Sequence, residues 1–406
     1  MAETLKLGAG IWGTKEDSLL AYNSENGNYK PLPFDFTRAS SATVVNKAGL
    51  IETVGSGTPR IDFLGNTNGA LLLEPQRTNL ITQSNQFNTS WAALGATLQD
   101  NQSGVSGGLN AWKMTEDTST AQHFVQLAGS LTAAAEQTVT IYAKAAERNY
   151  LMLNQSGVFR TYYDLVNGTV VSSGTGVTAS MESMPNGWWR CVYTATMTYT
   201  SLRVCVNNDG SSNSYTGDGV SGIYIQYCQN ESLSYPTSYI PTQGSSVTRV
   251  AEVCSQTLPS GIIGQTEGTM FFEINFPNTS GVAGAWSISD GSSANRITMN
   301  TTNFNSTQFT LSVAQNYNSG STKLASTNVT FIDNHKVAIK YSATTLKLFV
   351  DGAEVDSVTT DGFGNYTNFY VGGNQSGIGW ETRKFIQSNL YNTALSDAEC
   401  ITLTSL

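Results

Sequence analysis

The segment from residue 36 to residue 79 constrains the fold more than any other part of the chain. It is a series of apolar runs of three or four residues, such as Thr43-Val44-Val45 and Leu71-Leu72-Leu73, and Gly, Pro, Asn or Asp closes each run within a few residues. Runs that short cannot form helices, so they predict strand fragments joined by tight turns. Arg38, Arg60 and Arg77 fall at the predicted strand or turn edges, where a guanidinium group can hold backbone carbonyls or carboxylates and fix an irregular ribbon.

The order of short motifs in this segment carries a family resemblance. RASSAT begins at Arg38, Pro59-Arg60 follows, and LLLEP and RTN occupy residues 71–75 and 77–79. The segment resembles one found in structural proteins of tailed bacteriophages, where it precedes the sandwich domains of fibre, spike and head-decoration proteins. The resemblance continues through residues 13–23, 234–242 and 247–249, and it implies a virion context. A secreted bacterial adhesin with similar sandwiches is the alternative.

Composition limits the classes of partner. The 406 residues are enough for two or three domains, each with its own core. Charged residues make up only 13% of the chain, whereas 39% are hydrophobic, which suits packed β-structure with an uncharged polar surface rather than disorder. The net charge is −9 without a Lys/Arg cluster, so the phosphate-neutralising surface that nucleic-acid binding needs is missing. We expect no nucleic-acid partner.

The sequence also predicts where the protein is made. The first twenty residues lack a basic stretch followed by a long apolar core, so no signal peptide is expected, and no run of about eighteen apolar residues predicts a membrane span. Synthesis in the reducing host cytoplasm agrees with five cysteines, an odd number without CxxC spacing. A hairpin centred near Thr198 would place Cys191 opposite Cys205, but this compartment favours free thiols over a disulfide.

The predicted domains begin with a virion-attachment ribbon over residues 1–80, which is too irregular to form its own sandwich. Residues 81–250 contain longer strands that alternate apolar and polar positions and predict a jelly roll. Within this block, Asn167-Gly168 favours a type I′ hairpin. The block resembles the carbohydrate-binding jelly-roll modules attached to glycosidases, chiefly in residues 186–190 and 217–225.

Residues 251–264 show little periodicity and predict a linker, and residues 265–406 predict a second sandwich. Asp351-Gly352 indicates a hairpin turn, while Ser396 and Glu399 form a capping-box pattern that predicts a helix from Asp397 to Thr402. The order LFVDG, FYVGG and LYNTALSDAE resembles concanavalin-like or laminin-G-like sandwiches. The predicted fold class is therefore all-β, with an irregular N-terminal β ribbon followed by two antiparallel β-sandwich, or jelly-roll, domains.

The sequence contains few of the residue patterns that catalysis or metal binding requires. The two histidines, His123 and His335, lie far apart and are interpreted as edge or loop residues rather than members of a triad or zinc site. Concanavalin-like hydrolases carry an ExDxxE strand, but the matching strand here offers Glu273 alone. We therefore expect no enzyme activity, catalytic residue, metal site or cofactor. Residues 207–210 and 217–219 contain calcium-type oxygen ligands, although the turn-forming role of Asp-Gly is favoured there.

Sugar recognition is the strongest chemical hypothesis, because aromatic faces, amides and carboxylates together hold saccharides. Trp188 and Trp189 are less attractive, since at least one must face the core. For any single aromatic residue, packing is the alternative role. The candidate glycan-binding residues are Trp380, Asn374, Gln375 and Glu381 in the last domain and Tyr215 and Asp218 in the middle domain.

Together these features predict a phage virion structural protein, an external tail or head fibre or spike that displays lectin-like domains for adsorption to host-surface glycans. The expected partners are other virion proteins, two further copies of the chain in a homotrimer, and the host glycan, with no membrane insertion. One alternative is an architectural capsid-decoration or baseplate subunit that binds no sugar. The other is a virion-borne polysaccharide depolymerase, whose carboxylates would converge from separate strands or subunits.

Overall fold

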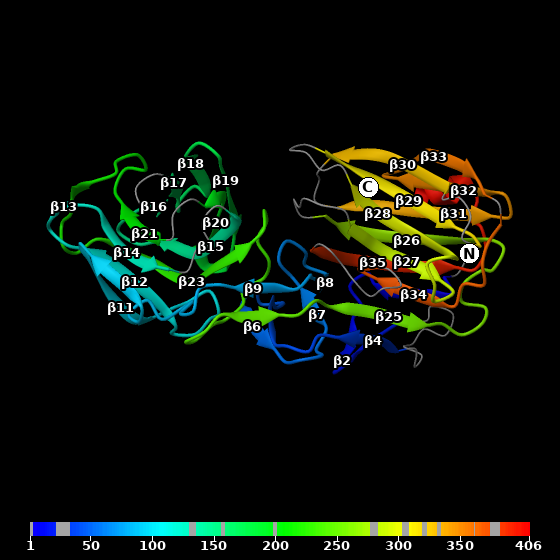
Figure 1. Cartoon of the computed structure of the whole chain (residues 1–406), viewed down its shortest axis with the longest axis horizontal. Helices are drawn as coiled ribbons and strands as arrows, with labels where there is room; N and C mark the ends of the chain where they lie inside the picture. The colour runs from blue at the N-terminus through cyan, green and yellow to red at the C-terminus, as the bar shows by residue number, and fades with distance from the viewer. Residues whose placement is uncertain are drawn as a thin grey trace. The chain divides into compact units, whose positions relative to one another are not determined.

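The computed structural model confirms the all-β prediction (Figure 1). It describes residues 3–21, 33–129, 135–155, 159–197, 201–276, 283–302, 308–318, 323–330, 334–360, 362–373 and 382–406. The chain forms two compact units, and each contains antiparallel sheets packed face to face. We call residues 48–53 and 77–249 the middle sandwich, and residues 1–47, 54–76 and 250–406 the composite sandwich.

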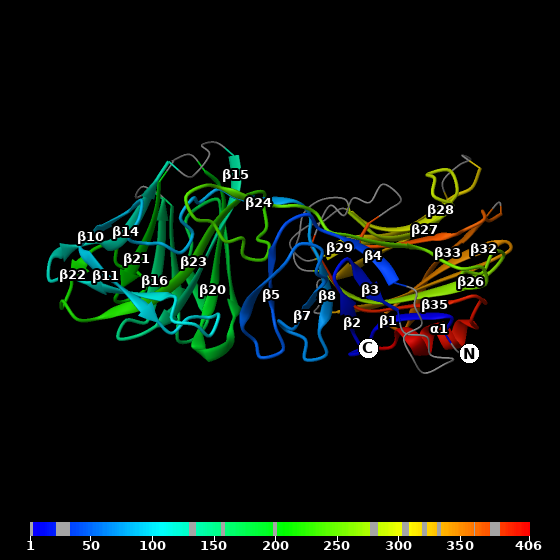
Figure 2. The ribbon, with the colours of Figure 1, turned by 90° about the horizontal axis from the view of Figure 1, so that it is seen from below.

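The middle sandwich consists of two six-stranded sheets. The front sheet has the order β10-β14-β21-β16-β17-β18 and the back sheet the order β11-β12-β23-β15-β20-β19. Figure 2 shows β14, β21 and β16 side by side in the front sheet. The front-sheet strands are β10 (Trp91–Leu94), β14 (His123–Ala128), β21 (Ser201–Asn207), β16 (Tyr150–Gln155), β17 (Phe159–Asp164) and β18 (Thr169–Ser172). The back-sheet strands are β11 (Ala96–Gln102), β12 (Ala111–Glu116), β23 (Gly222–Ser232), β15 (Ala135–Ala145), β20 (Trp189–Met197) and β19 (Val177–Ser183). Short pairs join β9 (Arg77–Asn79) to β24 (Val247–Arg249) and β13 (Thr120–Ala121) to β22 (Tyr215–Thr216), and a 3-10 turn spans Pro185–Gly187.

Alternation along the strands builds the core of the middle sandwich. Val125, Leu151, Leu153 and Val204 of the front sheet are fully buried, and they pack with Ile141 and other residues of the back sheet. Because successive strand residues point to opposite faces, the residues between them lie on the outer face of the front sheet. That outer face carries the candidate site described below.

The Asn167-Gly168 turn differs from the predicted type I′ form. Only Gly168 has a positive φ, of 68°, and its N–H donates to the carbonyl of Asp164 at 2.9 Å. The Asp164 carboxylate accepts the N–H groups of Val166 and Asn167, so this side chain sets a longer turn. A Cβ at Gly168 would lie 2.0 Å from the Trp189 ring, which explains why glycine is required there. Trp189 packs partly against the core and Trp188 is fully buried, as predicted for at least one of the two.

The composite sandwich contains an eight-stranded sheet and a nine-stranded sheet. The first has the order β33-β32-β31-β26-β35-β8-β7, with β1 also paired to β35, and the second the order β2-β3-β4-β25-β34-β27-β28-β29-β30. Its early strands are β1 (Leu5–Gly8), β2 (Gly13–Lys15), β3 (Ser18–Leu20), β4 (Pro33–Thr37), β5 (Ala42–Val45), β7 (Arg60–Asp62) and β8 (Ala70–Leu73), and β6 (Ile51–Val54) lies where the two units divide. Its later strands are β25 (Val253–Thr257), β26 (Gly268–Asn275), β27 (Ala283–Ser289), β28 (Arg296–Thr302), β29 (Gln308–Asn316), β30 (Lys323–Thr330), β31 (His335–Ser342), β32 (Thr345–Val350), β33 (Ala353–Thr359), β34 (Asn368–Val371) and β35 (Arg383–Tyr391).

The structure divides the chain differently from the predicted domains 1–80, 81–250, 251–264 and 265–406. Residues 1–47 and 54–76 do not form a separate ribbon, because their strands extend the sheets of the C-terminal sandwich. Leu71 of β8 pairs with Phe385 of β35, and Phe36 of β4 pairs with Cys254 of β25. β25 also lies inside the predicted linker, between β4 and β34. Short strands that cannot bury their apolar residues alone gain a core by joining larger sheets.

A buried ionic cluster fixes these early strands. Glu252 accepts hydrogen bonds from Arg38 at 2.7 Å, from both sides of the Arg60 guanidinium, and from the N–H of Glu74 at 2.9 Å. Arg60 also pairs with the Glu74 carboxylate at 2.8 Å and donates to the carbonyl of Thr43 at 2.9 Å. Burial alone would lower the pKa of Arg60, but Glu252 and Glu74 outweigh that effect and raise it. The predicted role of these arginines in holding carbonyls and carboxylates is confirmed.

Arg77 makes a different contact in the middle sandwich, with an aromatic side chain. Its guanidinium carbon lies 4.8 Å from the centre of the Tyr235 ring, and it donates to the Tyr235 hydroxyl. Both residues are buried. The arginine at the end of the motif therefore links β9 to the loop after β23.

Several local predictions are confirmed. Asp351 and Gly352 both have positive φ, as a type I′ turn between β32 and β33 requires. Ser396 and Glu399 form both bonds of the capping box at the start of α1 (Asp397–Thr404). All five cysteines are free and buried, and Cys191 and Cys205 lie on opposite sheets rather than across a hairpin. No helix in the described ranges is long and apolar enough to cross a membrane.

Candidate functional site

The outer face of the front sheet, called here the front face, carries two rows of side chains across four neighbouring strands. The register aligns Cys205 with both Phe124 and Met152, and Met152 with Tyr162. This apolar row forms its own cluster, separate from the core between the sheets. The parallel polar row, two residues further along each strand, consists of Gln126, Arg203, Asn154 and Arg160.

The apolar row forms the floor of the front face. Phe124 is 5% exposed and Tyr162 6%, while Met152 and Cys205 are almost completely buried. The guanidinium carbon of Arg203 lies 4.5 Å from the centre of the Phe124 ring, which is cation–π distance. Burial also raises the pKa of Tyr162. The floor is therefore apolar, with the side chains of the polar row beside and above it.

Arg203 is held in place by amide side chains. Its Nε donates to Gln126 Oε1 at 2.7 Å, and one terminal nitrogen donates to Gln122 Oε1 at 2.9 Å. The Gln122 amide donates in turn to Asn213. This chain of bonds fixes the guanidinium plane and the Gln126 amide.

Arg160 differs from Arg203 in having no such partners. Its side chain is half-buried, and its Nε is shielded from solvent without a hydrogen bond. Within the part of the chain that the structure describes, no carboxylate forms an ion pair with it. A shielded donor without a hydrogen bond is costly, and the Nε of Arg77, Arg190, Arg249 and Arg383 share this state. What distinguishes Arg160 is its place on the front face without a described carboxylate partner.

At the far end of the front face, a loop from residue 208 to residue 214 is closed by its own side chains. Asn207 donates to the carbonyl of Ser212 at 2.6 Å, and the Asp209 carboxylate accepts the N–H groups of Ser211 and Ser212. Hydrogen bonds from Ser212 lower the pKa of Asp209 to about 2. The Asp209 oxygens, predicted as turn formers rather than calcium ligands, are thus engaged within the loop.

The sequence-predicted Tyr215 and Asp218 lie beside this loop, around the buried carboxylate of Glu116. Tyr215 donates its hydroxyl to Glu116 at 2.6 Å, Arg148 binds the same carboxylate with two nitrogens, and the N–H of Asp218 donates to it at 2.9 Å. Burial would raise the pKa of Glu116, but the hydrogen bonds from Arg148 and Tyr215 outweigh it and lower the pKa. All these donors point inward, so the cluster acts as a clamp on the loop.

Asp218 has a further local role. Its carboxylate accepts the Ser221 hydroxyl at 2.6 Å and the N–H groups of Val220 and Ser221 at 2.9 and 2.7 Å. These bonds, led by the Ser221 hydroxyl, lower the pKa of Asp218. Tyr215 lies between the His123 ring, 4.7 Å away, and the Arg148 guanidinium, 5.7 Å away. The structure therefore brings Tyr215 and Asp218 together around Glu116. The side chains that contact the Tyr215 ring, His123 and Arg148, belong to the middle sandwich.

The four predicted residues of the C-terminal loop, Trp380, Asn374, Gln375 and Glu381, lie outside the described residues. The prediction that the two histidines are edge or loop residues is wrong, because both are buried in strands, β14 and β31, that have a neighbour on each side. The His123 ring nitrogens lie 2.6 Å from the Gly95 carbonyl and 3.2 Å from the Tyr215 carbonyl. Those of His335 lie 2.7 Å from the Asp351 carboxylate and 2.9 Å from the Thr330 carbonyl. Among the described residues, no group of three His, Cys, Asp or Glu side chains converges on a metal position.

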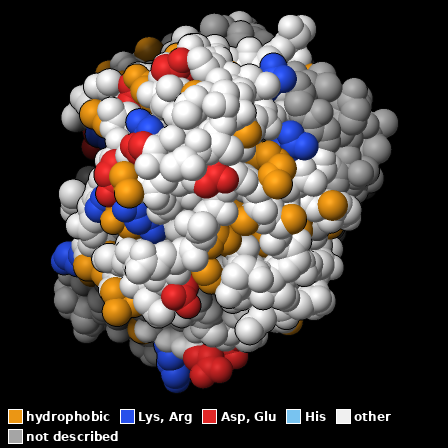
Figure 3. All heavy atoms as spheres, turned by 90° about the vertical axis from the view of Figure 1, so that its left-hand side faces the viewer, with side chains coloured by type: hydrophobic (Ala, Val, Ile, Leu, Met, Phe, Trp, Pro, Cys, Tyr) orange, Lys and Arg blue, Asp and Glu red, His pale blue; other side chains and the backbone are white. Residues whose placement is uncertain are grey.

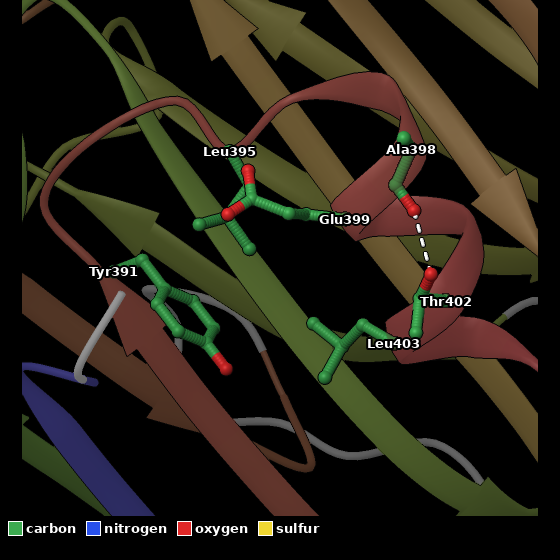
Figure 4. Close-up of a pocket in the computed structure, with 6 residues that line it drawn as sticks. All are labelled: Tyr391, Leu395, Ala398, Glu399, Thr402 and Leu403. Carbon is green, nitrogen blue, oxygen red and sulfur yellow. Dashed lines mark hydrogen bonds between the residues drawn. The ribbon is translucent and has the colours of Figure 1, made fainter.

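The composite sandwich has an open pocket of about 340 Å³ between α1 and the end of β35. Figure 4 shows Tyr391, Leu395 and Leu403 forming its apolar wall, with Glu399 beside them. The Glu399 carboxylate already accepts the hydroxyl and N–H of Ser396, each at 2.7 Å, in the capping box. The pocket therefore follows from the docking of a short helix on the sheet, and the front face offers the more varied set of polar groups.

The residues of the front face were missed in the sequence, although a signal was present. Every second residue of β17 is large and polar or aromatic, giving Arg160, Tyr162 and Asp164, and the same face of β21 carries Arg203 and Asn207 on either side of Cys205. A solvent face built only for solubility would carry small hydroxyl residues, as much of this chain does. Aligning the strands required the register, which the sequence does not give.

Figure 3 views the end of the molecule that bears β11, β13 and β14, and shows a mostly uncharged surface over which apolar, basic and acidic side chains are scattered. Leu94 and Val220 of the middle sandwich are among the exposed apolar residues.

Comparisons with known proteins give no family. No family model matches the chain, and no curated protein matches it. Solved structures with partial similarity include the CBM40 of a Ruminococcus gnavus IT-sialidase bound to alpha2,3 sialyllactose, at 17% identity and a TM-score of 0.29 over 35% of this chain and 84% of that chain. Domains LG4-5 of the mouse laminin alpha1 chain match at 13% identity and a TM-score of 0.25 over 69% of this chain and 90% of that chain. A SAP-like pentraxin from Limulus polyphemus matches at 14% identity and a TM-score of 0.29 over 35% of this chain and 70% of that chain. At TM-scores this low, none of them bears on what this chain binds.

The carboxylates of the loop clamp predict acid sensitivity of the middle sandwich. A carboxylate whose pKa is lower in the folded than in the unfolded chain stabilises the fold above its unfolded pKa, and that contribution is lost as the pH falls through the folded pKa. Glu116, with an ordinary value of 4.5, and Asp209, lowered to about 2, both have depressed values. We expect the melting temperature to fall as the pH is lowered from 4.5 to 2. The melting temperature of the Glu116→Gln variant, measured by calorimetry, should fall less steeply over this pH range. The surface variant Glu182→Gln should follow the wild type. Parallel curves of melting temperature against pH for all three proteins would contradict the clamp.

Proposed function

We propose that this protein binds glycans through the front face of its middle sandwich, and that it does so without catalysis. The observation that carries the proposal is the polar row of the front face. Gln126, Arg203 and Arg160 are half-buried and offer amide and guanidinium donors, whereas the neighbouring apolar row is buried. Sugars present hydroxyl groups at their edges, so these donors match them.

The preorganisation of the polar row supports binding rather than a purely structural role. The Gln126 carbonyl accepts from Arg203, which leaves the two amide hydrogens of Gln126 to donate to a sugar hydroxyl. Arg160 adds donors that no described carboxylate occupies. Hydrogen bonds to amides and guanidinium groups fix the orientation of a saccharide.

The sequence resemblance to tailed-phage structural proteins supports a place on the exterior of a virion. On this proposal the protein is part of a fibre or spike, its partners are other virion proteins and two further copies of itself in a homotrimer, and its front face contacts host-surface glycans during adsorption. The arginines of the resembling motif hold the early strands in the composite sandwich through the buried ionic cluster.

A glycan array with the full chain tests the proposal. We expect the wild-type protein to bind a defined subset of glycans, and Gln126→Ala to weaken that binding about two- to tenfold, as loss of one neutral hydrogen bond implies. The matched control is Gln102→Ala, because Gln102 is also a half-buried glutamine on a strand but lies in the back sheet. Both variants should melt at the wild-type temperature. Equal binding by all three proteins, or binding by none of them, would contradict the proposed site.

A further inference from the structure

The cationic groups of the front face are arranged asymmetrically. Asn154 of β16 lies opposite Arg203 of β21 on one side and opposite Arg160 of β17 on the other. Neighbouring strands are about 4.8 Å apart, so the backbones of the two arginines lie roughly 10 Å apart, one strand to each side of Asn154. The Arg203 side chain contacts Phe124 and Gln126 of β14, whereas Arg160 is on the opposite side of Asn154. Acidic residues lie at the opposite end, since Asp164 is four residues further along β17, or roughly 13 Å from Arg160.

The acidic groups near the front face do not neutralise the arginines. The Asp164 carboxylate is occupied by the N–H groups of Val166 and Asn167 and by the Asn167 amide. The Asp209 carboxylate is occupied by Ser211 and Ser212. Arg203 is bound by neutral glutamine oxygens, and Arg160 forms no ion pair with a described residue. Two guanidinium groups on a strongly acidic chain thus lack carboxylate partners at the basic end of the front face.

We infer that the glycan bound at the front face is acidic, with its carboxylate held by Arg160. This inference rests on the proposed function and names its ligand class. A guanidinium binds a carboxylate with charge-assisted hydrogen bonds, which are shorter and stronger than bonds to a neutral hydroxyl. The Gln126 amide then donates to a hydroxyl of the sugar.

The negative charge of the whole chain excludes nonspecific attraction as a cause of binding to an acidic polysaccharide. A chain with a net charge of −9 repels polyanions, so nonspecific attraction does not produce binding to an acidic polysaccharide. Any such binding must come from a local site. Exposed ion pairs are weakened by salt, and a half-buried guanidinium retains part of its interaction when salt is added.

The test compares acidic polysaccharides with their neutral forms. The full chain is titrated with polygalacturonate, alginate and hyaluronate, and with the same three polymers after chemical reduction of their carboxyl groups to alcohols. We expect at least one acidic polymer to bind and its reduced form to bind at least tenfold more weakly. Arg160→Gln should lower affinity for the acidic form about tenfold or more, because a charge-assisted bond is lost. Arg160→Lys should retain part of that affinity.

Lys144→Gln is the control, because it removes the same charge from a half-buried side chain of the back sheet and should bind as the wild type does. Three outcomes distinguish the inference of an acidic ligand from the proposed glycan binding. Loss on carboxyl reduction together with loss in Arg160→Gln supports the inference. Equal binding of acidic and reduced forms, sensitive to Gln126→Ala but not to Arg160→Gln, overturns the acidic ligand and leaves the proposed function standing. Binding of none of the six polymers, together with a glycan array without hits, overturns both.

Discussion

Replacing Glu252 by alanine should lower the free energy of unfolding of the composite sandwich by about 3–5 kcal/mol, because it leaves two buried guanidinium groups without their shared carboxylate. Arg38 and Arg60 are both fully buried, and each donates to Glu252 at 2.7 Å. The N–H of Glu74 would also lose its acceptor. Arg60 would keep its ion pair with Glu74. Both guanidinium groups would nevertheless stay buried away from water.

Urea unfolding, followed by hydrogen exchange in peptides from β26 and β35, measures this loss for the composite sandwich alone. The control is Glu354→Ala, since Glu354 forms a solvent-exposed pair with Lys347 at 2.9 Å and such pairs contribute about 0–1 kcal/mol. A loss below 1 kcal/mol in Glu252→Ala would show that the cluster does not hold the early strands.

Deleting residues 1–47 should prevent the composite sandwich from folding. The truncation removes β1 from one sheet and β2, β3 and β4 from the other, together with Arg38. It also removes five large core side chains, each of which contributes about 1.5–3 kcal/mol when buried, and the total is roughly the whole stability of an ordinary domain. The five residues are Leu5, Leu7, Leu19, Phe34 and Phe36.

This expectation differs from the one that a virion-attachment ribbon over residues 1–80 would give, because the remaining sandwiches would then stay folded without it. Hydrogen exchange distinguishes the two cases. Peptides from β26 and β31 should exchange as in an unfolded chain, while those from β15 in the middle sandwich keep their protection. Native protection of β26 in the truncated protein would mean that the early strands are an attachment and not part of the core.

The parts of the fold that sequence reasoning predicted are those that local chemistry decides. The capping box of Ser396 and Glu399 and the turn at Asp351-Gly352 depend on residues within a few positions of one another. Alternating strands were recognisable because burial on one face leaves a period of two. These features need no knowledge of the distant chain.

The parts that could not be predicted depend on contacts between distant residues. Leu71 finds its partner in Phe385, and Glu252 meets Arg38, so the ribbon could not be assigned to the C-terminal sandwich from its own residues. At Asn167-Gly168, a local preference was present but the Asp164 carboxylate and the Trp189 ring decided the turn. The candidate site has the same origin, because Arg160 and Arg203 become neighbours of Asn154 only through the register of three strands.

Hydrogen exchange of the full chain, with and without the glycan that binds most strongly on the array, tests the central claim most directly. Amide exchange reports where a bound ligand stabilises the backbone beneath it. The account predicts that added protection concentrates in β14, β16, β17 and β21, the strands that carry the polar and apolar rows. Protection confined to the composite sandwich, with no change in these four strands, would contradict it.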